Sequence, residues 1–432
     1  MRNCLKYLFY LGSLLLWLVV IAVALELWVR WQYHTVETKN PFVLSRTQGE
    51  QWPIPDAQSN DFSDWLLDEA LRAKYRGKGK STEPLPPISH EWEMQNRMAL
   101  FNDLDEWGQG VFKNLYKTDA DVTEDVTNVV DVTSEKELWK EEHFLYKKHV
   151  RRKDHVNVLG LTENFYSNNH GFRDADFPVE KGECVFRIVC VGASTTEEGP
   201  TNDLTYPAIL EAMLNRHFDT NRFEVINCGI SGMNALKHRV RSADYLALNP
   251  DLIIVYNAVN DICHDLFQIW VKDASPCKQQ LRESKFINHY FNGKLLPDSD
   301  EMGILIKQSK MADLRFIADR AKDQNVPVAL CSFAAPDMER LSVEERSYYD
   351  YCTLKEWGGC YVTFISYLRA LKTYNTAIRE LCNAEKLLYI PIAEELRGGA
   401  EIFGDICHLR NPGIEAKAKL IADFLIEKEV VK

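Results

Sequence analysis

A serine near the middle of the chain and an Asp/His pair near its C-terminus could together form a catalytic triad. Ser194 stands in the segment VGASTT (191–196), and Asp405 precedes His408 by three residues in the segment GDICHLRNP (404–412). An aspartate at this spacing can hold the Nδ1–H of the imidazole, so that Nε2 is free to take a proton from a serine hydroxyl. Taken separately, the serine fits a helix cap equally well and the Asp/His pair fits a surface turn better. Their combination predicts nucleophilic serine catalysis.

Two further segments contain residues that could bind a negatively charged intermediate. The segment NCGISGMN (227–234) contains Gly229 and Gly232, and glycines let the backbone approach a ligand closely, although a tight turn also requires them. In the segment NAVND (257–261), the side-chain amide of Asn260 could donate to an oxyanion, although Asn-Asp is also an ordinary turn pair. Backbone N–H groups near Ser194, at the start of a helix, are further donors.

Each of these four segments follows an apolar run of strand length. The runs are FRIVCV (186–191), FEVIN (223–227), LIIVY (252–256), VALCSF (328–333) and LLYIPI (387–392), and amphipathic stretches at 206–218, 235–248, 304–322, 363–384 and 413–428 alternate with them. Runs that are apolar throughout indicate strands buried on both faces, which is typical of parallel sheets covered by helices. The sequence therefore predicts an α/β fold, a three-layer α/β/α (flavodoxin-like) sheet of about five parallel strands. Because ligands bind beyond the carboxyl ends of such strands, the four segments should meet at one edge.

These segments resemble the four blocks of the SGNH hydrolase superfamily, also called GDSL esterases and lipases, over about residues 168–428. The resemblance implies that Ser194, Asp405 and His408 are catalytic. It also implies that Ser194, Gly232 and Asn260 form the oxyanion hole. The segment NHGFRD (169–174) is similar to a lead-in of membrane-anchored bacterial members.

Three features complicate this resemblance. Ala193 stands where the family name has Asp, which is similar to a Gly-x-Ser-Thr-Thr variant of the family. Ala258 stands where glycine is usual, and its methyl group would tighten the oxyanion pocket. Gly229 is an alternative to Gly232 as the functional glycine.

The resemblance implies a serine ester hydrolase, an acyl- or acetylesterase, that requires no metal and no organic cofactor. An ester-bearing lipid or an acylated glycan is the expected substrate, and Phe267, Trp270, Trp357 and Tyr361 are the expected lining residues. Two alternatives stay open: an O-acyltransferase acting on cell-envelope glycans, and a catalytically silent membrane-tethered binding module. A zinc site at Cys407-His408 is disfavoured because no Cys-x-x-Cys accompanies it.

The N-terminal segment predicts a single membrane-spanning helix. From Tyr7 to Leu25 there are 19 consecutive uncharged residues, which as a helix would span about 28 Å. A cleaved signal peptide is the competing interpretation because Ala22-Val23-Ala24 has the small-x-small form, but the apolar run exceeds the usual length. We therefore expect a single-pass anchor with the catalytic domain on the extracytoplasmic side.

Three regions follow from these assignments. Residues 1–34 are the predicted anchor, 35–167 a stalk of poorly defined structure, and 168–432 the SGNH hydrolase domain with insertions at 264–302 and 336–362. The basic run KKHVRRK (147–153) is interpreted as a solvated helix end or linker rather than a phosphate site. Cys277, Cys352 and Cys360 are candidates for disulfides if the domain is extracytoplasmic.

The overall composition excludes few classes but argues against one. The chain has 432 residues, of which 46% are hydrophobic and 26% charged, which is typical of globular proteins. Its net charge of -12 argues against nucleic-acid binding, which needs a basic face to neutralise phosphates. The sequence leaves the oligomeric state open.

Overall fold

A five-stranded parallel sheet forms the centre of the C-terminal part of the chain. The computed structural model describes residues 2–54, 62–68, 72, 104–106, 108–109, 111, 130–132, 146–272, 274–356 and 362–432. The strands are β4 (Phe186–Gly192), β5 (Phe223–Gly229), β6 (Leu252–Tyr256), β7 (Val328–Cys331) and β8 (Leu388–Ile390). They lie in the order β5-β4-β6-β7-β8, with every neighbouring pair parallel. This is the flavodoxin-like order, and each strand overlaps a predicted apolar run, so the predicted fold class is confirmed.

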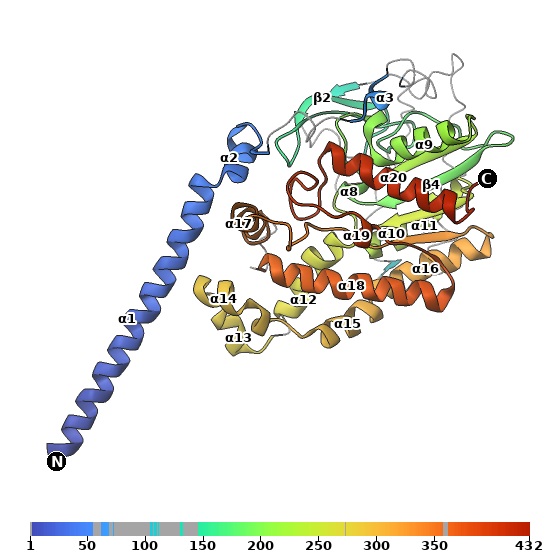
Figure 1. Cartoon of the computed structure of the whole chain (residues 1–432). Coiled ribbons are helices and arrows are strands. Elements are labelled where there is room, and N and C mark those ends of the chain that lie inside the picture. Colours follow the sequence, from blue (N-terminus) through green and yellow to red (C-terminus); the bar gives the residue numbers. More distant parts are fainter. Residues whose placement is uncertain are drawn as a thin grey trace.

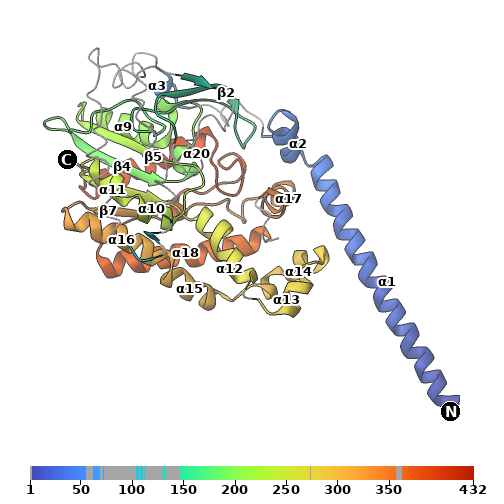
Figure 2. The ribbon, with the colours of Figure 1, turned by 180° about the vertical axis from the view of Figure 1, so that it is seen from behind.

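Helices cover both faces of this sheet (Figures 1 and 2). One layer contains α9 (Tyr206–His217) and α20 (Asn411–Glu427), which pack against each other. The other contains α10 (Ala235–Val240), α11 (Ser242–Ala247), α16 (Lys310–Asp323) and α18 (Phe364–Glu385). The stretches 235–248 and 304–322 each form two helices rather than one. In the second, α15 (Ser299–Gln308) ends at Ser309, whose hydroxyl donates to the Leu305 carbonyl at 2.7 Å.

The N-terminal helix α1 (Arg2–Lys39) projects away from the rest of the protein (Figure 1). The stretch Phe9–Lys39 is long and apolar enough to cross a membrane, by length and composition. Contacts with the domain begin at Glu26, whose carboxylate accepts from the Ser284 hydroxyl at 2.9 Å and from the Phe286 N–H at 3.0 Å. Its partner there is α14 (Lys285–Leu295), so only the C-terminal part of α1 is docked.

The segment after α1 packs onto the domain built around the five-stranded sheet. Helix α2 (Pro41–Gln48) buries Phe42 and Val43, and Trp52 beyond it is 8% exposed. The sequence of the stalk region predicts a helix near 62–75, and the short helix α3 (Asp64–Leu67) lies within it. Residues 91–117 could form a second helix by their sequence, but most of them lie outside the described residues. Where it is described, the predicted stalk is therefore in contact with the domain, because its apolar side chains join the same core.

A small second sheet also belongs to the region predicted as a stalk. It has the order β1-β2-β3, with β1 (Val130–Val132) parallel and β3 (Thr162–Tyr166) antiparallel to β2 (Val150–Val156). The basic run 147–153 thus enters a strand, so its interpretation as a helix end is wrong. Alternating burial along β2, with Arg152 only 8% exposed, explains how a charged run can form a strand. The boundaries at 34/35 and 167/168 stay predictions.

The two predicted insertions are largely helical. The first contains η4 (Asp261–Leu266), α12 (Phe267–Lys272), α13 (Pro276–Leu281) and α14, and the second contains α17 (Val343–Tyr351) and η5 (Cys352–Glu356). Short elements elsewhere are α8 (Ser194–Glu197), η3 (Asn202–Leu204) and α19 (Ile392–Glu395).

Candidate active site

Ser194 is the first residue of α8, immediately beyond the carboxyl end of β4. The tight connection depends on Gly192, because a Cβ at that position would lie 2.1 Å from Thr196 Oγ1 and 2.5 Å from the Tyr256 carbonyl oxygen. Neither contact is tolerable for a side chain, so glycine is required for close packing here. The sequence thus folds so that the serine hydroxyl stands at the end of the sheet, as the motif predicted.

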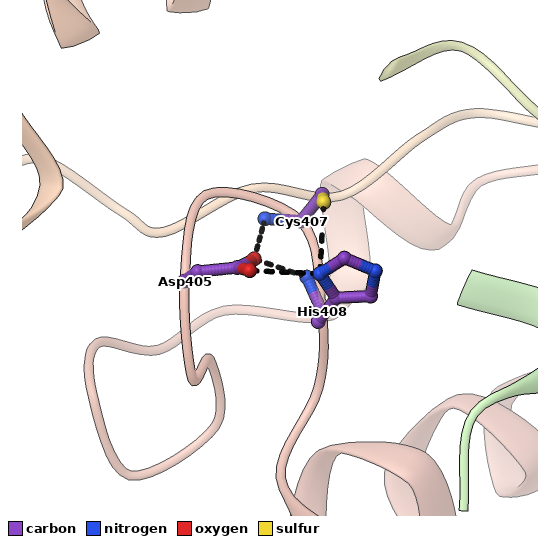
Figure 3. Close-up of side chains that lie close together, drawn as sticks. All are labelled: Asp405, Cys407 and His408. Atoms are coloured by element: carbon purple, nitrogen blue, oxygen red, sulfur yellow. Dashed lines mark hydrogen bonds and ion pairs between the residues drawn. The ribbon is translucent and has the colours of Figure 1, made fainter. Parts of the chain in front are cut away.

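The loop 404–410 brings Asp405 and His408 to this serine. His408 Nε2 lies 2.8 Å from Ser194 Oγ, and His408 Nδ1 lies 2.7 Å from Asp405 Oδ2. The other carboxylate oxygen accepts from the backbone N–H groups of Cys407, at 2.9 Å, and His408, at 2.7 Å. Figure 3 shows the carboxylate facing the imidazole across this turn. The three residues therefore form one continuous hydrogen-bonded chain.

The electrostatics of this chain suit a base that takes a proton. Burial by itself would raise the pKa of Asp405, but the charge and hydrogen bonds of His408 and the charge of Arg46 hold that pKa below its usual range. Burial likewise opposes protonation of His408, yet Asp405 and Glu198 raise its pKa above the ordinary value. An ionised Asp405 thus stabilises the imidazolium that forms when His408 takes a proton.

The residues predicted for the oxyanion hole lie in the two neighbouring loops. Gly232 is exposed, with φ +76°. Asn260 is buried, and its side-chain amide donates to the Met233 carbonyl at 2.7 Å. Within the described chain, the backbone N–H groups of Ser194 and Gly232 have no protein acceptor. The described residues that line the adjacent cavity include Ser194, Ser231 and His408 but neither Gly232 nor Asn260.

Gly229, the alternative glycine, is part of the packed turn. Its N–H donates to the Asn227 side chain at 2.9 Å, and a Cβ at this position would lie 2.5 Å from the Glu197 nitrogen. The backbone donor of Gly229 is thus already used, which favours Gly232.

A cavity of about 450 Å³ opens beside Ser194 and His408. One wall comes from the second sheet and its β2–β3 turn, including Arg152, His155, Val158, Leu161 and Phe165. This wall was not predicted from the sequence, because the lining residues were expected in the two insertions. The basic run 147–153 was the only signal in the sequence for the part of the wall that contains Arg152.

The expected lining residues lie elsewhere. Phe267 and Trp270 are buried against each other, with ring centroids 5.5 Å apart, and the described cavity lining does not include them. The expectation for these two is wrong, because their helix α12 packs its aromatic rings into the core. Trp357 and Tyr361 lie outside the described residues.

Two consecutive glutamates in the segment that follows Ser194, Glu197 and Glu198, form hydrogen bonds that connect the loops of the site. Glu197 accepts from the Tyr146 hydroxyl at 2.6 Å and from the Ser231 N–H at 2.8 Å. Burial raises the pKa of Glu197 to about 7, partly offset by Arg173 and Tyr146. Its carboxylate thereby holds the 230–233 loop, which contains the predicted oxyanion glycine.

Glu198 connects α8 to the histidine loop and to α20. Its carboxylate accepts from the Leu409 N–H at 2.9 Å and from Lys417 Nζ at 3.0 Å. Lys417 is fully buried and also donates to the Thr195 carbonyl at 2.5 Å. This pair was not predicted from the sequence. A lysine on the apolar face of an amphipathic helix could have indicated it, because a buried ammonium group needs a buried partner.

The side chains of Asp405, Cys407 and His408 lie close enough together to suggest metal ligation, but their bonding favours the triad. Their ligand atoms lie within 4.8 Å of one another. However, the carboxylate and Nδ1 are bonded to each other, and Nε2 faces Ser194. Of the disulfide candidates, Cys277 is an exposed free thiol. Cys360 lies outside the described residues.

The fold is a three-layer α/β/α sandwich, and a hydrogen-bonded Ser194-His408-Asp405 chain lies at the carboxyl edge of its sheet. The family model described as "GDSL-like Lipase/Acylhydrolase family" matches residues 190–413, and the chain belongs to this family, one of the SGNH hydrolases. The predicted resemblance is therefore confirmed at the level of the family.

Several solved structures are similar to the chain. They include the acetyl xylan esterase AlAXEase (18% identity, TM-score 0.36, 56% of this chain and 100% of that one). Others are the esterase EstA from Pseudoalteromonas sp. (11%, 0.35, 57% and 99%) and a putative lipolytic protein from Desulfitobacterium hafniense DCB-2 (12%, 0.33, 55% and 97%). No curated protein gives a match.

Proposed function

We propose that the protein is a serine ester hydrolase in which Ser194 is the nucleophile, His408 the general base and Asp405 the residue that orients the base. The observation that carries this proposal is the distance of 2.8 Å between Ser194 Oγ and His408 Nε2. The hydrogen bond between His408 Nδ1 and Asp405 Oδ2 continues the chain from the base to the carboxylate. A nucleophile, a base and an orienting carboxylate within hydrogen-bond reach are the geometric signature of acyl transfer.

In the proposed reaction, His408 Nε2 accepts the Ser194 hydroxyl proton as Oγ attacks the ester carbonyl carbon. The tetrahedral intermediate collapses when the C–O bond to the alcohol breaks, and the imidazolium returns its proton to the leaving alcohol. Water, deprotonated by the same histidine, then attacks the acyl-serine and releases the acid. No metal or organic cofactor is required for these steps.

The proposed oxyanion donors are the N–H groups of Ser194 and Gly232 and the amide of Asn260. An amide nitrogen has two hydrogens, and the bond to Met233 uses only one of them. Loss of one such donor typically costs about 3–4 kcal/mol of transition-state stabilisation.

A serine substitution tests the proposal. We expect Ser194→Ala to fold, as judged by thermal unfolding in detergent, but to lose at least about 1,000-fold in hydrolysis of p-nitrophenyl esters and all labelling by a fluorophosphonate. Ser231→Ala removes the other serine hydroxyl that lines the cavity and is the matched control that keeps the labelling. Unchanged turnover in Ser194→Ala would contradict the assignment.

The proposed substrate is an ester with a small acyl group, as in an acetylesterase. A cavity of about 450 Å³ with a mixed polar and apolar lining is in the range of single small-molecule sites. A series of p-nitrophenyl esters from acetate to laurate would test this, and a maximum at laurate would favour a lipid substrate instead.

We further propose that α1 is retained as a single-pass anchor and that the catalytic domain is extracytoplasmic. The apolar side chains of the first half of α1, such as Leu14 and Trp17, are exposed and fit a lipid environment. Carbonate extraction, N-terminal sequencing and reporter fusions after residue 432 would test the anchor and its orientation. An N-terminus that begins at Leu25 would identify a cleaved signal peptide.

Our proposal for the domains keeps residues 1–34 as the anchor and 168–432 as the hydrolase domain. Parts of 35–167 complete the hydrolase, since α2 and the β2–β3 hairpin contribute to its core and cavity.

A further inference from the structure

Arg46, in the last turn of α2, lies between the proposed triad and the cavity wall. Its Nη2 is 3.8 Å from Asp405 Oδ2, and Nη1 donates to the Tyr348 hydroxyl at 3.2 Å and to Cys352 Sγ at 3.4 Å. On the other side, Nε donates to the Val158 carbonyl at 2.6 Å. The Arg46 side chain is only 9% exposed, and its hydrogen bonds to Tyr348 and Cys352 are partly buried, whereas its hydrogen bond to Val158 lies at the surface.

Helix α2 is held firmly enough to place this guanidinium. Asn40 caps the helix by accepting from the Phe42 N–H at 3.0 Å, and its amide donates to the Glu344 carbonyl at 2.8 Å. Phe42 packs edge-on against Trp52, with ring centroids 5.1 Å apart. The helix therefore contacts α17 on one side and lies at the junction between α1 and the domain (Figures 1 and 2).

The residues that Arg46 contacts connect it to the loop that contains Asp405 and to the β2–β3 turn. The Tyr348 hydroxyl also donates to the carbonyl of Gly404, the residue before Asp405. On the hairpin side, Gly160 has φ +73°, and a Cβ there would lie 3.1 Å from the Arg46 carbonyl oxygen. One helix turn thus supports both the aspartate loop and the β2–β3 turn.

We propose that Arg46 is a positioning residue for the ester hydrolysis proposed above. Its guanidinium holds the Asp405 carboxylate toward His408 and fixes the β2–β3 turn over the cavity. Arg46 does not touch the reacting atoms, and it acts through Asp405 and Val158. The helix that follows the proposed membrane anchor is accordingly part of the catalytic assembly, although it lies outside the 190–413 region that defines the family.

Arg46 is one of several charged or titratable groups around the triad, and its effect on the base has a defined sign. Its positive charge disfavours the imidazolium of His408, whereas Asp405 and Glu198 favour it. Cys407, Tyr349 and Tyr367 also interact electrostatically with Asp405. Removing the guanidinium charge therefore makes His408 easier to protonate.

Two substitutions of Arg46, one that removes its positive charge and one that keeps it, test the proposal on the full-length protein in detergent. We expect Arg46→Met to lower kcat for p-nitrophenyl acetate by about 10- to 100-fold, the loss typical of misplaced catalytic groups. The acid limb of its pH–rate profile should also move to higher pH. Arg46→Lys keeps the charge and should keep the limb in place while losing part of kcat. Arg340→Met is the matched control, because that arginine is 61% exposed and pairs with Asp337.

A second readout does not depend on turnover. In protein labelled with ¹³C-histidine, the His408 resonance can be identified by its loss in His408→Gln, and its titration should move to higher pH in Arg46→Met but not in Arg46→Lys. The proposal is overturned if the His408 titration does not move in Arg46→Met. It is also overturned if the acid limb of the pH–rate profile of this variant does not move and its kcat stays within twofold of wild type. If the wild type hydrolyses no ester, the proposed function fails, and the histidine titration alone decides the role of Arg46.

Discussion

The buried carboxyl group of Glu197 should make the stability of this protein depend on pH in an unusual direction. Glu197 is 8% exposed and accepts from Tyr146 and Ser231. Burial raises its pKa from 4.5 to about 7, so the folded protein binds a proton that the unfolded chain releases. The resulting stabilisation is fully present below about pH 4.5 and is lost as the pH rises through about 7.

The size of the effect follows from these two pKa values. A change from 4.5 to about 7, at about 1.4 kcal/mol for each pH unit, corresponds to about 3 kcal/mol of unfolding free energy. Glu197→Gln removes the titration and keeps a carbonyl oxygen that can accept from Tyr146 and Ser231. Its stability relative to wild type should therefore increase by about 3 kcal/mol between pH 4.5 and pH 8.

Urea unfolding of the full-length protein in detergent, followed by tryptophan fluorescence, measures this difference at each pH. Glu380→Gln is the matched control, since Glu380 is 53% exposed and forms a surface pair with Lys307. The control should run parallel to wild type across the range. If Glu197→Gln also runs parallel to wild type, Glu197 titrates normally and the reasoning from burial is refuted.

Three further substitutions probe the site. Asp405→Asn should lower kcat by about 10,000-fold, because the amide no longer selects the productive tautomer of His408. Kinetics with p-nitrophenyl acetate would check this, and a loss under tenfold would contradict it. Lys417→Met should lower the free energy of unfolding by about 3–5 kcal/mol, because it leaves the Glu198 carboxylate unpaired in the interior. Adding Glu198→Gln should restore part of the lost free energy, and urea unfolding followed by tryptophan fluorescence would measure both. Gly192→Ala should not accumulate as folded protein, as judged by size-exclusion chromatography, because its Cβ would lie 2.1 Å from Thr196 Oγ1; a folded variant would show that the turn can relax.

The sheet was predictable because burial on both faces leaves a local trace in the sequence. Each strand from β4 to β8 needs apolar side chains pointing in both directions, so the composition of a few consecutive residues indicates it. The same argument placed Ser194 and His408 at one edge, since parallel strands end together. It could not supply their separation, which depends on the course of the loop 404–410.

The cavity wall and Arg46 were not predictable for a physical reason. Arg46 and Val158 are 112 residues apart, and Arg46 and Asp405 are further apart still. Contacts of this kind follow no sequence period, and a buried arginine has the same local composition as an exposed one. Lys417 differs from Arg46, because its position among the apolar residues on one face of α20 could have indicated a buried partner.

Two parts of the chain build the site, and only one of them lies within the region that the family model matches. The strands and loops from β4 onward hold the serine, the histidine and the aspartate, whereas one wall of the cavity comes from residues 146–165, upstream of the family match. In the reaction we propose, the first part performs the chemistry and the second selects which esters reach Ser194. Since Arg46 contacts both parts, changes in α2 should alter turnover and substrate choice together, whereas changes at the cavity end of the β2–β3 hairpin should alter substrate choice alone.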